Sequence, residues 1–400
     1  MRIGMMADAY KPHVSGITNY IELNKRYLEA AGHEVYVFTF GDLDYVDDEP
    51  RVIRSPGVPL ADTGYYLSLR YTTKARRLLQ TMDVVHVHHP FLSGRLALRY
   101  CRPLRIPIVF TNHTRYDLYA QTYIPFLPEG MSKSLLRAYL PAFCDAVDKV
   151  ISPSAGVAQV LRDLGVTAPI EIVPNGVELK RFREAQPFPR AEFGFGEGDV
   201  LLIYAGRIAP EKNLPFLLRA FAGVAQALPN VYLLLIGGGQ KQWESELSQL
   251  IGELQIGSRV RWTGMVSYER LPAYLAMGDA FVTASVTEVH PLSVIEAMGA
   301  GLPVVGIRSP GVGDTVLHEE TGFLSSNDLA AFTAYLTRIC LEGERRRELG
   351  LQARREAEKY DIQRTSQIML AHYEQLVTAS RPHQADWRVR LRALWERVRR

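Results

Sequence analysis

The chain has 400 residues, of which 47% are hydrophobic, and its formal net charge is only +3. This length exceeds what one hydrophobic core usually organises, so two globular domains are expected. The small net charge argues against a nucleic-acid-binding protein, and the hydrophobic fraction excludes a disordered chain. Cys101, Cys144 and Cys340 are odd in number and far apart. They therefore suggest neither a disulfide framework nor a zinc ribbon and favour a reducing cytosol.

The sequence contains no obvious segment for crossing a membrane. Its N-terminal apolar run is too short for a signal peptide, and no apolar stretch is long enough to span a bilayer. We therefore predict a cytoplasmic protein.

Short apolar runs alternate with amphipathic segments in the first half of the chain. This alternation is typical of parallel strands that are buried on both faces and joined by crossover helices. A strand at residues 2–6, a helix near residues 18–31 and a strand at residues 34–38 predict a βαβ unit. Further strands are expected at residues 52–53, 84–87, 108–110, 149–151 and 171–173.

The same pattern restarts after a polar, proline-rich stretch at residues 180–199. Strands are expected in the second half at residues 200–205, 231–236, 260–262, 280–282 and 303–305. We therefore predict an α/β protein with two doubly wound Rossmann-like domains, residues 1–179 and 200–359, facing across a cleft, with residues 180–199 as the linker. Ligands of such sheets bind at the carboxyl ends of the strands, so the loops after strands are the candidate site.

The loop after the first strand brings Gly16 to a predicted helix N-terminus. Free N–H groups and the helix dipole favour an anion there, and a glycine would let a phosphate approach closely. An equally good interpretation is a tight turn in which Gly16 adopts a positive φ.

Two cations follow the strand at residues 200–205, in the sequence Gly-Arg-Ile-Ala-Pro-Glu-Lys-Asn of residues 206–213. Arg207 can bind a phosphate through two parallel hydrogen bonds, and Lys212 supplies a compact charge. The alternative is that both are solvated cations pairing with Glu211. The position at the carboxyl end of a strand favours binding of a diphosphate, which would then need no magnesium.

Two carboxylates, Glu288 and Glu296, are separated by seven residues around a predicted helix start at Leu292. Glu288 would accept hydrogen bonds from sugar hydroxyls, and Glu296 would accept them from ribose hydroxyls. The N–H groups of Leu292 and Ser293 would bind the diphosphate between them. Alternatively, Glu296 caps or pairs on an exposed helix face. Its apolar neighbours weigh against this, because an unpaired buried carboxylate is costly.

The order and spacing of these motifs resemble the retaining glycosyltransferases of family 4, which have the two-Rossmann-domain GT-B architecture. The resemblance covers roughly residues 1–378 and includes Pro-Asn-Gly-Val at residues 174–177. Residues 112–119 and the amphipathic stretch 131–143 are most similar to the diacylglycerol glucosyltransferase-like branch, in which the first domain docks on the membrane.

The resemblance also implies roles for individual residues. His113, which follows the strand at 108–110, matches a histidine that contacts the donor sugar near its reacting carbon. A satisfied core or capping histidine is the structural alternative. The resemblance implies His113 and Glu288 as catalytic residues and no metal or other cofactor, because the nucleotide sugar is a substrate. The donor-binding residues that it implies are Gly16, Arg207, Lys212, Val266 through its backbone to the base, Leu292, Ser293 and Glu296.

Three sequence features bear on the donor and on metals. Many relatives have Glu-Gly-Phe-Gly or Glu-Gly-Phe-Pro where Val289 and His290 follow Glu288 here. Pro291 has no N–H to offer a sugar. The identity of the donor sugar therefore stays open, and the donor is expected to be a UDP-hexose or a GDP-hexose. The Asp-x-Asp pattern at residues 42–44 lies in an acidic run and is interpreted as a solvated loop. The histidines at residues 86, 88 and 89 are interpreted as a cleft wall and not as metal ligands.

The last forty residues add a prediction about the acceptor. A helix near residues 360–378 crosses back to the first domain in the family, and residues 381–400 predict a basic amphipathic helix. Such a helix suits an anionic bilayer interface or, equally, packs on the protein's own surface. We predict a hexosyltransferase that acts on a membrane lipid such as diacylglycerol at the inner face of the plasma membrane. The alternatives are a soluble or polysaccharide-precursor acceptor, or a nucleotide-sugar epimerase.

Overall fold

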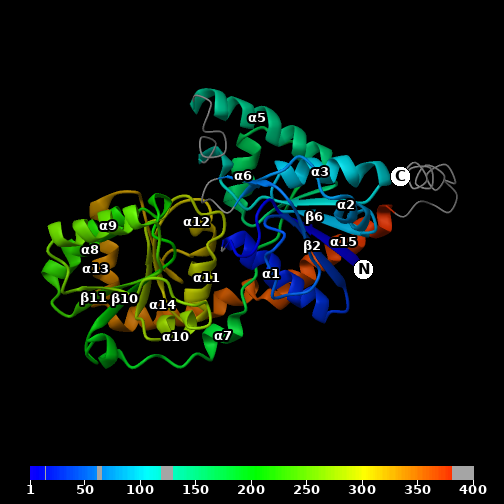
Figure 1. The fold of residues 1–400 in the computed structure, drawn as a ribbon. Coiled ribbons are helices and arrows are strands. Elements are labelled where there is room, and N and C mark those ends of the chain that lie inside the picture. Colours follow the sequence, from blue (N-terminus) through cyan, green and yellow to red (C-terminus); the bar gives the residue numbers. More distant parts are fainter. Residues whose placement is uncertain (14, 61–64, 119–128, 381–400) are drawn as a thin grey trace. The chain divides into compact units, whose positions relative to one another are not determined.

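The computed structural model describes the chain except for residue 14 and residues 61–64, 119–128 and 381–400, and it leaves out the side chains of residues 129–133. The predicted basic tail at 381–400 thus lies outside the described residues. The chain divides into two compact units (Figure 1). The first contains Met1–Pro153, Ala158–Gly176 and the chain from Gln363 onward, and the second contains Ser154–Val157 and Val177–Ile362. Residues 180–199, expected as the linker, belong to the second unit.

The described part of the first unit holds a sheet of seven parallel strands. In spatial order these strands are β3 (Val52–Ser55), β2 (Glu34–Phe40), β1 (Arg2–Met6), β6 (Val84–Val87), β7 (Ile108–Thr111), β8 (Lys149–Ser152) and β9 (Ile170–Ile172). Alternate residues of β1 face opposite sides: Ile3 and Met5 pack in one core, and Met6 packs in the other. This explains why β1 has no polar side chain after Arg2, as expected for a strand buried on both faces.

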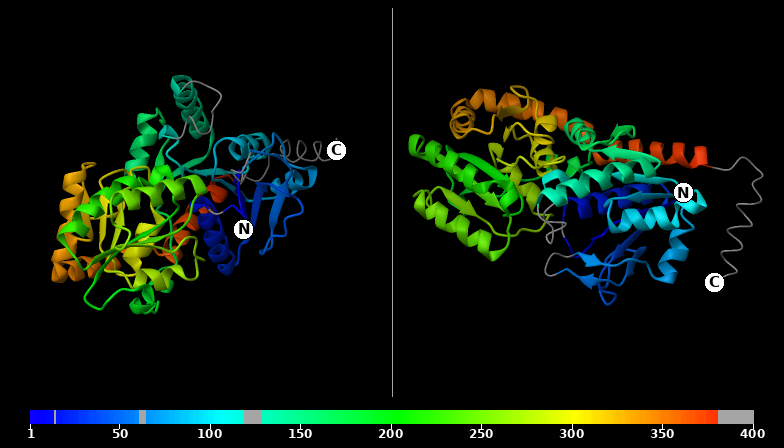
Figure 2. Two further views of the ribbon diagram at one scale, coloured as in Figure 1. Left: turned by 60° about the vertical axis from the view of Figure 1, so that its left-hand side comes forward. Right: turned by 90° about the horizontal axis from the view of Figure 1, so that it is seen from above.

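Helices cover both faces of this sheet (Figures 1 and 2). On one face lie α1 (Gly16–Ala30) and α15 (Ile362–Ser380), the helix expected near 360–378. On the other face lie α2 (Thr73–Leu79), α3 (Leu92–Tyr100), α5 (Glu129–Ala146) and α6 (Ala155–Asp163). A short hairpin of β4 (Val58–Pro59) and β5 (Tyr66–Leu67) precedes α2.

The second unit has a described sheet of six parallel strands. In spatial order they are β12 (Val260–Trp262), β11 (Val231–Ile236), β10 (Val200–Ala205), β13 (Ala280–Thr283), β14 (Val304–Ile307) and β15 (Gly322–Ser325). The prediction omitted β15. A Cβ on Gly322 would lie 2.0 Å from the carbonyl oxygen of Val304, so this edge strand requires a residue that usually weakens a strand prediction.

The helices of the second unit also form two layers. One core contains α8 (Leu214–Ala227), α9 (Lys241–Glu253) and α13 (Leu329–Leu341). The other contains α7 (Leu179–Arg183), α10 (Leu271–Ala276), α11 (Leu292–Gly299) and α12 (Val312–Thr315), and α14 (Gly343–Glu356) contributes to both. The predicted fold class, two doubly wound parallel sheets, is therefore confirmed. No helix in the described ranges combines the length and apolar character needed to cross a bilayer.

Candidate functional site

The two loops that carry the charged motifs of the second unit meet at one edge of its sheet. Strands β10 and β13 are parallel neighbours, so their carboxyl ends lie together. The side-chain nitrogen of Asn213 donates to the carbonyl oxygen of Ala284 at 3.2 Å. The hydroxyls of Ser285 and Thr287 both donate to the carbonyl oxygen of Glu211, at 3.2 and 3.3 Å. Residues far apart in sequence thus form one hydrogen-bonded loop pair.

An ion pair joins the two motifs at the centre of this loop pair. Lys212 Nζ lies 2.5 Å from Glu288 Oε1, and both side chains are largely buried. Burial alone would raise the pKa of Glu288, but the charge and hydrogen bond of Lys212 outweigh it and the pKa is lowered. The carboxylate is therefore ionised at neutral pH, and the ammonium has an anion beside it.

Arg207 differs from Lys212 in its surroundings. Its side chain is 65% exposed, and its guanidinium pairs with Glu211 at 2.8 Å. The surface pairing considered as an alternative is therefore present for Arg207, whereas Lys212 pairs with Glu288 instead. A cation this exposed can exchange its carboxylate partner for a phosphate at little cost, because surface ion pairs contribute little free energy.

Glycines that the sequence reasoning missed let the backbone segments of this edge approach closely. A Cβ on Gly237 would lie 2.0 Å from the carbonyl oxygen of Gly206, so the cation loop rests directly on the end of β11. Gly311 has a φ of +82°, and a Cβ there would lie 2.5 Å from the carbonyl oxygen of Glu288. Both glycines position motif residues by making room for their backbone.

The N-terminus of α11 lies between the two predicted carboxylates in sequence. Its N-cap is Pro291, which has no side-chain hydrogen bond, and the N–H groups of Val294 and Ile295 bond to the Pro291 carbonyl. The N–H groups of Leu292 and Ser293 come before the first intrahelical donor, as at any helix start. These two groups and the helix dipole can bind an anion.

Glu296 lies inside the protein and not on an exposed helix face. Its side chain is 4% exposed, and it accepts a 2.8 Å hydrogen bond from the hydroxyl of Tyr268. Burial raises the pKa of Glu296 to about 7, although the Tyr268 hydrogen bond and the charge of Arg181 oppose the rise. The Arg181 guanidinium lies over the Tyr268 ring, 5.2 Å from its centroid.

Tyr268 is a site residue that the sequence reasoning did not find. It lies in the loop after β12, two residues beyond the partly buried Val266. A signal was available, because a tyrosine in a loop after a strand can present its hydroxyl to a neighbouring group. In this structure that neighbour is the carboxylate of Glu296.

The Val289-His290 departure from the family pattern is explained by packing. His290 is buried, and its ring contacts Tyr360 edge to face at a centroid distance of 4.9 Å. Burial lowers the pKa of His290 to about 3, so the ring is neutral. The imidazole therefore contributes to the core beside Glu288.

In the first unit, Gly16 begins α1. Ser15 is the N-cap and accepts from the N–H of Thr18 at 3.2 Å. The φ of Gly16 lies outside the left-handed region, so the tight-turn interpretation is not supported. A Cβ at this position would meet no heavy atom within 4 Å. The space beside Gly16 is therefore open.

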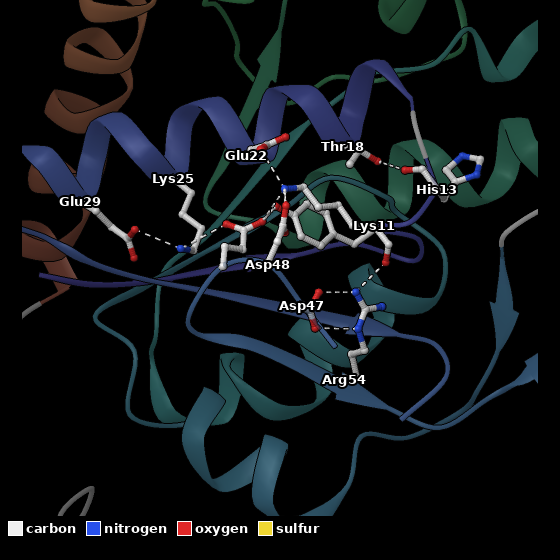
Figure 3. Close-up of polar contacts among 11 residues, drawn as sticks. Lys11, His13, Thr18, Glu22, Lys25, Glu29, Asp47, Asp48 and Arg54 are labelled. Carbon is white, nitrogen blue, oxygen red and sulfur yellow. Dashed lines mark hydrogen bonds and ion pairs between the residues drawn. The ribbon is translucent and has the colours of Figure 1, made fainter. Parts of the chain in front are cut away.

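An ion-pair network holds the loop before α1 in place (Figure 3). Lys25 on α1 is only 2% exposed and pairs with Glu29 at 3.0 Å and with Glu49 at 3.3 Å. Lys11 lies 2.8 Å from Glu22 and also pairs with Asp48 and Glu49.

The same network corrects the prediction of a solvated acidic loop. Asp42 and Asp44 are exposed as expected, but Asp47 forms a 2.6 Å ion pair with the largely buried Arg54, whose guanidinium also donates to the carbonyl of Lys11 (Figure 3). The acidic residues nearest β3 supply counter-charges to buried cations, which an acidic run alone does not reveal.

His113 follows β7 and is partly exposed. Its Nε2 lies 3.0 Å from Nδ1 of His88, and the ring of Tyr20 packs 4.7 Å from its own. The predicted histidine is thus held by one side-chain hydrogen bond and by ring contacts with Tyr20 and His88. His86, His88 and His89 are all buried, and the described residues include no cluster of three or more His, Cys, Asp or Glu arranged to hold a metal ion.

Solved structures with the same arrangement of elements define the class. Sucrose-phosphate synthase from Thermosynechococcus elongatus superposes with a TM-score of 0.78 at 24% identity and covers 94% of this chain and 99% of its own. Anabaena HepE, in complex with UDP and glucose, superposes with a TM-score of 0.76 at 19% identity, covering 94% and 100%. The chain therefore has the GT-B fold.

Sequence comparisons give the family. Residues 14–181 match the Glycosyltransferase Family 4 model, and residues 186–356 match the Glycosyl transferases group 1 model. An alpha-monoglucosyldiacylglycerol synthase from Streptococcus pneumoniae is 31% identical over 82% of this chain and 77% of its own length. The synthase of the same name from Acholeplasma laidlawii is 31% identical over 76% of this chain and 80% of its own length. A sulfoquinovosyl transferase from Arabidopsis thaliana is 32% identical over 87% of this chain and 68% of its own length. The chain belongs to glycosyltransferase family 4, and it is a glycosyltransferase.

Proposed function

We propose that this enzyme transfers a hexose from a UDP- or GDP-hexose to a membrane lipid such as diacylglycerol, with retention of the anomeric configuration. The donor half of the proposal is supported by the Lys212–Glu288 pair beside the N-terminus of α11. The acceptor half is supported by 31% identity to two enzymes that are each named alpha-monoglucosyldiacylglycerol synthase. UDP as the nucleotide is supported by the complex of the structurally similar HepE with UDP.

The chemistry would rest on neutralising the leaving diphosphate. Lys212, Arg207 and the N–H groups at the start of α11 supply positive charge and hydrogen bonds, so we propose that neither a metal nor another cofactor is required. The donor would take Lys212 from Glu288, which frees the carboxylate to accept hydrogen bonds from sugar hydroxyls. No carboxylate in this loop pair serves as a covalent nucleophile in the proposal. The rate would come from orientation and leaving-group stabilisation.

A basic face of the first unit supports a membrane surface as the partner. The sequence contains no acidic residue between positions 84 and 116, a stretch that includes α3. This helix and α2 and α5 cover the same face of the sheet. Exposed cations on and beside these helices are Arg70, Lys74, Arg77, Arg95, Arg99, Arg102, Arg105 and Arg137. Such a surface suits an anionic bilayer, and we propose that the enzyme is peripheral to a membrane.

The proposal is tested with a panel of UDP- and GDP-hexoses, assayed with and without anionic vesicles that contain diacylglycerol. We expect transfer from one donor, dependent on vesicles and insensitive to a chelator, with the α-anomer retained in the product. Lys74→Glu with Arg102→Glu should weaken vesicle binding roughly thirtyfold, at about 1 kcal/mol for each basic residue. The matched control is Arg347→Glu with Arg355→Glu, two exposed cations of α14. Equal vesicle binding by both variants would remove the lipid surface from the proposal.

Gly16→Ala separates a ligand-contacting glycine from a structural one. Because an added Cβ meets nothing and φ is not positive, the melting temperature should stay at or above that of the parent. If the diphosphate approaches this backbone, KM for the donor should rise about tenfold, as for the loss of roughly 1.4 kcal/mol of binding. Gly252→Ala on α9, which also adds a Cβ in open space, is the control. An unchanged KM in Gly16→Ala would exclude close approach of the donor at Gly16.

A further inference from the structure

His88 and His113 are joined by a hydrogen bond that couples their protonation patterns. The 3.0 Å contact runs between Nδ1 of His88 and Nε2 of His113. Burial lowers the pKa of each ring well below its usual value, and the neighbouring histidines add to the effect. Both rings are therefore neutral at pH 7, and each carries a single N–H. One ring must then donate and the other accept, so the tautomer of one fixes the tautomer of the other.

The side chain of His88 makes no other hydrogen bond in the described part of the chain. Its side chain is 0% exposed, and its Nε2 is buried without a hydrogen-bond partner. The ring is held by aromatic contacts instead, 4.2 Å from the ring of His86 and 5.5 Å from that of Tyr20. A buried imidazole with one unused nitrogen costs stability. Among the described residues, the hydrogen bond to His113 is the one polar interaction that the side chain of His88 provides in return.

The ring beside His88 is fixed from both sides. Nδ1 of His86 lies 2.6 Å from the hydroxyl of Tyr373 on α15, and its Nε2 lies 2.7 Å from the hydroxyl of Thr111 at the end of β7. Because both nitrogens of His86 are engaged, its ring cannot rotate without breaking two buried hydrogen bonds. His88 packs against this fixed ring, so its own orientation toward His113 is also restricted.

The unused nitrogen indicates the direction of the hydrogen bond. If His113 donated, His88 would carry its proton on Nε2, which would leave a buried N–H with no acceptor. If His88 donates from Nδ1, Nε2 keeps only a lone pair. Orphaned buried N–H groups are rarer in proteins than under-satisfied acceptors. The second arrangement places the proton of His113 on Nδ1, a nitrogen with no protein partner among the described residues of this partly exposed ring.

We propose that His88 is a positioning residue that holds His113 in the tautomer with its proton on Nδ1, so that His113 meets the substrate as a hydrogen-bond donor. The inference rests on the proposed function and on the contact between His113 and the donor sugar that the family resemblance implies. A neutral ring that presents N–H binds a hydroxyl oxygen, whereas the other tautomer would present a lone pair to it. His88 would thereby decide whether a sugar hydroxyl is accepted in the orientation needed for transfer.

The test compares His88→Asn with His88→Gln and His88→Leu. The amide of Asn reaches the position of Nδ1 and can still bond to His113, whereas the amide of Gln extends toward the position of Nε2. We expect kcat of His88→Gln and His88→Leu to fall roughly tenfold to a hundredfold, as for a misplaced substrate contact. KM for the donor should change little, and His88→Asn should recover most of the rate. If His88→Leu does not fold, the Asn and Gln variants carry the comparison.

A second measurement reads the tautomer without any substrate. Imidazole ¹⁵N chemical shifts of the free enzyme, with His113 assigned by its loss in His113→Gln, should show the proton on Nδ1 in the parent. They should show a mixture of tautomers in His88→Gln. A mixture in the parent, or full kcat in His88→Gln while His113→Gln is inactive, would overturn the inference alone. Full activity of His113→Gln would instead contradict the contact between His113 and the donor sugar that the family resemblance implies.

Discussion

Lys212→Met is expected to lower kcat/KM for the nucleotide sugar by roughly 10²–10³-fold, the loss typical of removing one preorganised group that stabilises developing charge. The ammonium is already beside the α11 loop through its 2.5 Å pair with Glu288, so no rearrangement of the backbone is needed to supply it. Lys241→Met, an exposed lysine at the start of α9, is the control. Steady-state kinetics over a range of donor concentrations measure the effect.

The same substitution also changes stability, and the sign depends on pH. In the parent the pKa of Glu288 is lowered. The pairing of Glu288 with Lys212 therefore stabilises the fold at pH values above the ordinary carboxyl pKa. This stabilisation is lost as the pH falls through the lowered pKa. Without Lys212, burial dominates and raises the pKa of Glu288. Lys212→Met should therefore be destabilised by about 1–3 kcal/mol at pH 7, and this loss should shrink at low pH.

The double variant Lys212→Met with Glu288→Gln separates the two effects. Gln has no charge to leave unpaired, so thermal melts at pH 7 should recover most of the lost stability. The rate should stay low, because the cation is still absent. Parental turnover in Lys212→Met, or recovery of activity together with stability in the double variant, would show that the ammonium acts only on folding.

Donor affinity is expected to fall as the pH drops below about 7. Burial raises the pKa of Glu296 to about 7, and the ionised carboxylate is the better acceptor for two ribose hydroxyls. Below this pKa, Kd should rise by up to tenfold for each pH unit, because binding must select the ionised form. The intact nucleotide sugar is the ligand to titrate, since the terminal phosphate of a free nucleotide itself titrates near pH 6.

Glu296→Gln should weaken donor binding and stabilise the protein. A carboxyl group whose pKa is raised by folding binds its proton more tightly in the folded state. Its ionisation therefore costs stability as the pH rises from the pKa of the unfolded chain to about 7, the pKa in the folded protein. The full cost above that pH is on the order of 3 kcal/mol. Gln removes it while keeping an oxygen for the Tyr268 hydroxyl. Melts at pH 8 should therefore show a higher melting temperature than the parent, and melts at pH 5 a much smaller gain.

Tyr268→Phe tests whether Tyr268 controls the pKa of Glu296 and thereby the pH dependence of donor affinity. The Tyr268 hydrogen bond lowers the pKa of Glu296, so its removal should move the midpoint of the donor-affinity profile to higher pH. A profile that is flat between pH 6 and pH 8 in the parent would contradict the assignment of Glu296 as the ribose acceptor. A midpoint unmoved in Tyr268→Phe would mean that Tyr268 does not control this carboxyl.

The parts of the molecule that the sequence predicted well depend on local patterns. Strands such as β10 and β11 are continuous apolar runs bounded by polar residues, and their ends were predicted to the residue. The charged motifs could be placed at the carboxyl ends of strands by the same reasoning. In contrast, β15 begins with Gly322, whose role depends on the close approach of Val304 from another strand.

The parts that were missed depend on contacts between distant segments. The pairing of Lys212 with Glu288 and not with Glu211 follows from the order of β10 and β13 in the sheet, which composition does not encode. The hydrogen bond from the hydroxyl of Tyr268 to Glu296 joins the loop after β12 to α11, 28 positions further along the chain. The same holds for His88 and His113, which follow the neighbouring strands β6 and β7.

The cations beside α1 and those on α2 and α3 differ in their acidic neighbours. Beside α1, the cations Lys11, Lys25 and Arg54 are matched by carboxylates (Figure 3), whereas α2 and α3 carry cations and no acidic residue. A negatively charged surface would attract the cations of α2 and α3 within about 10 Å at 0.1 M salt, so its pull on these two helices would act on the orientation of the unit before any contact forms.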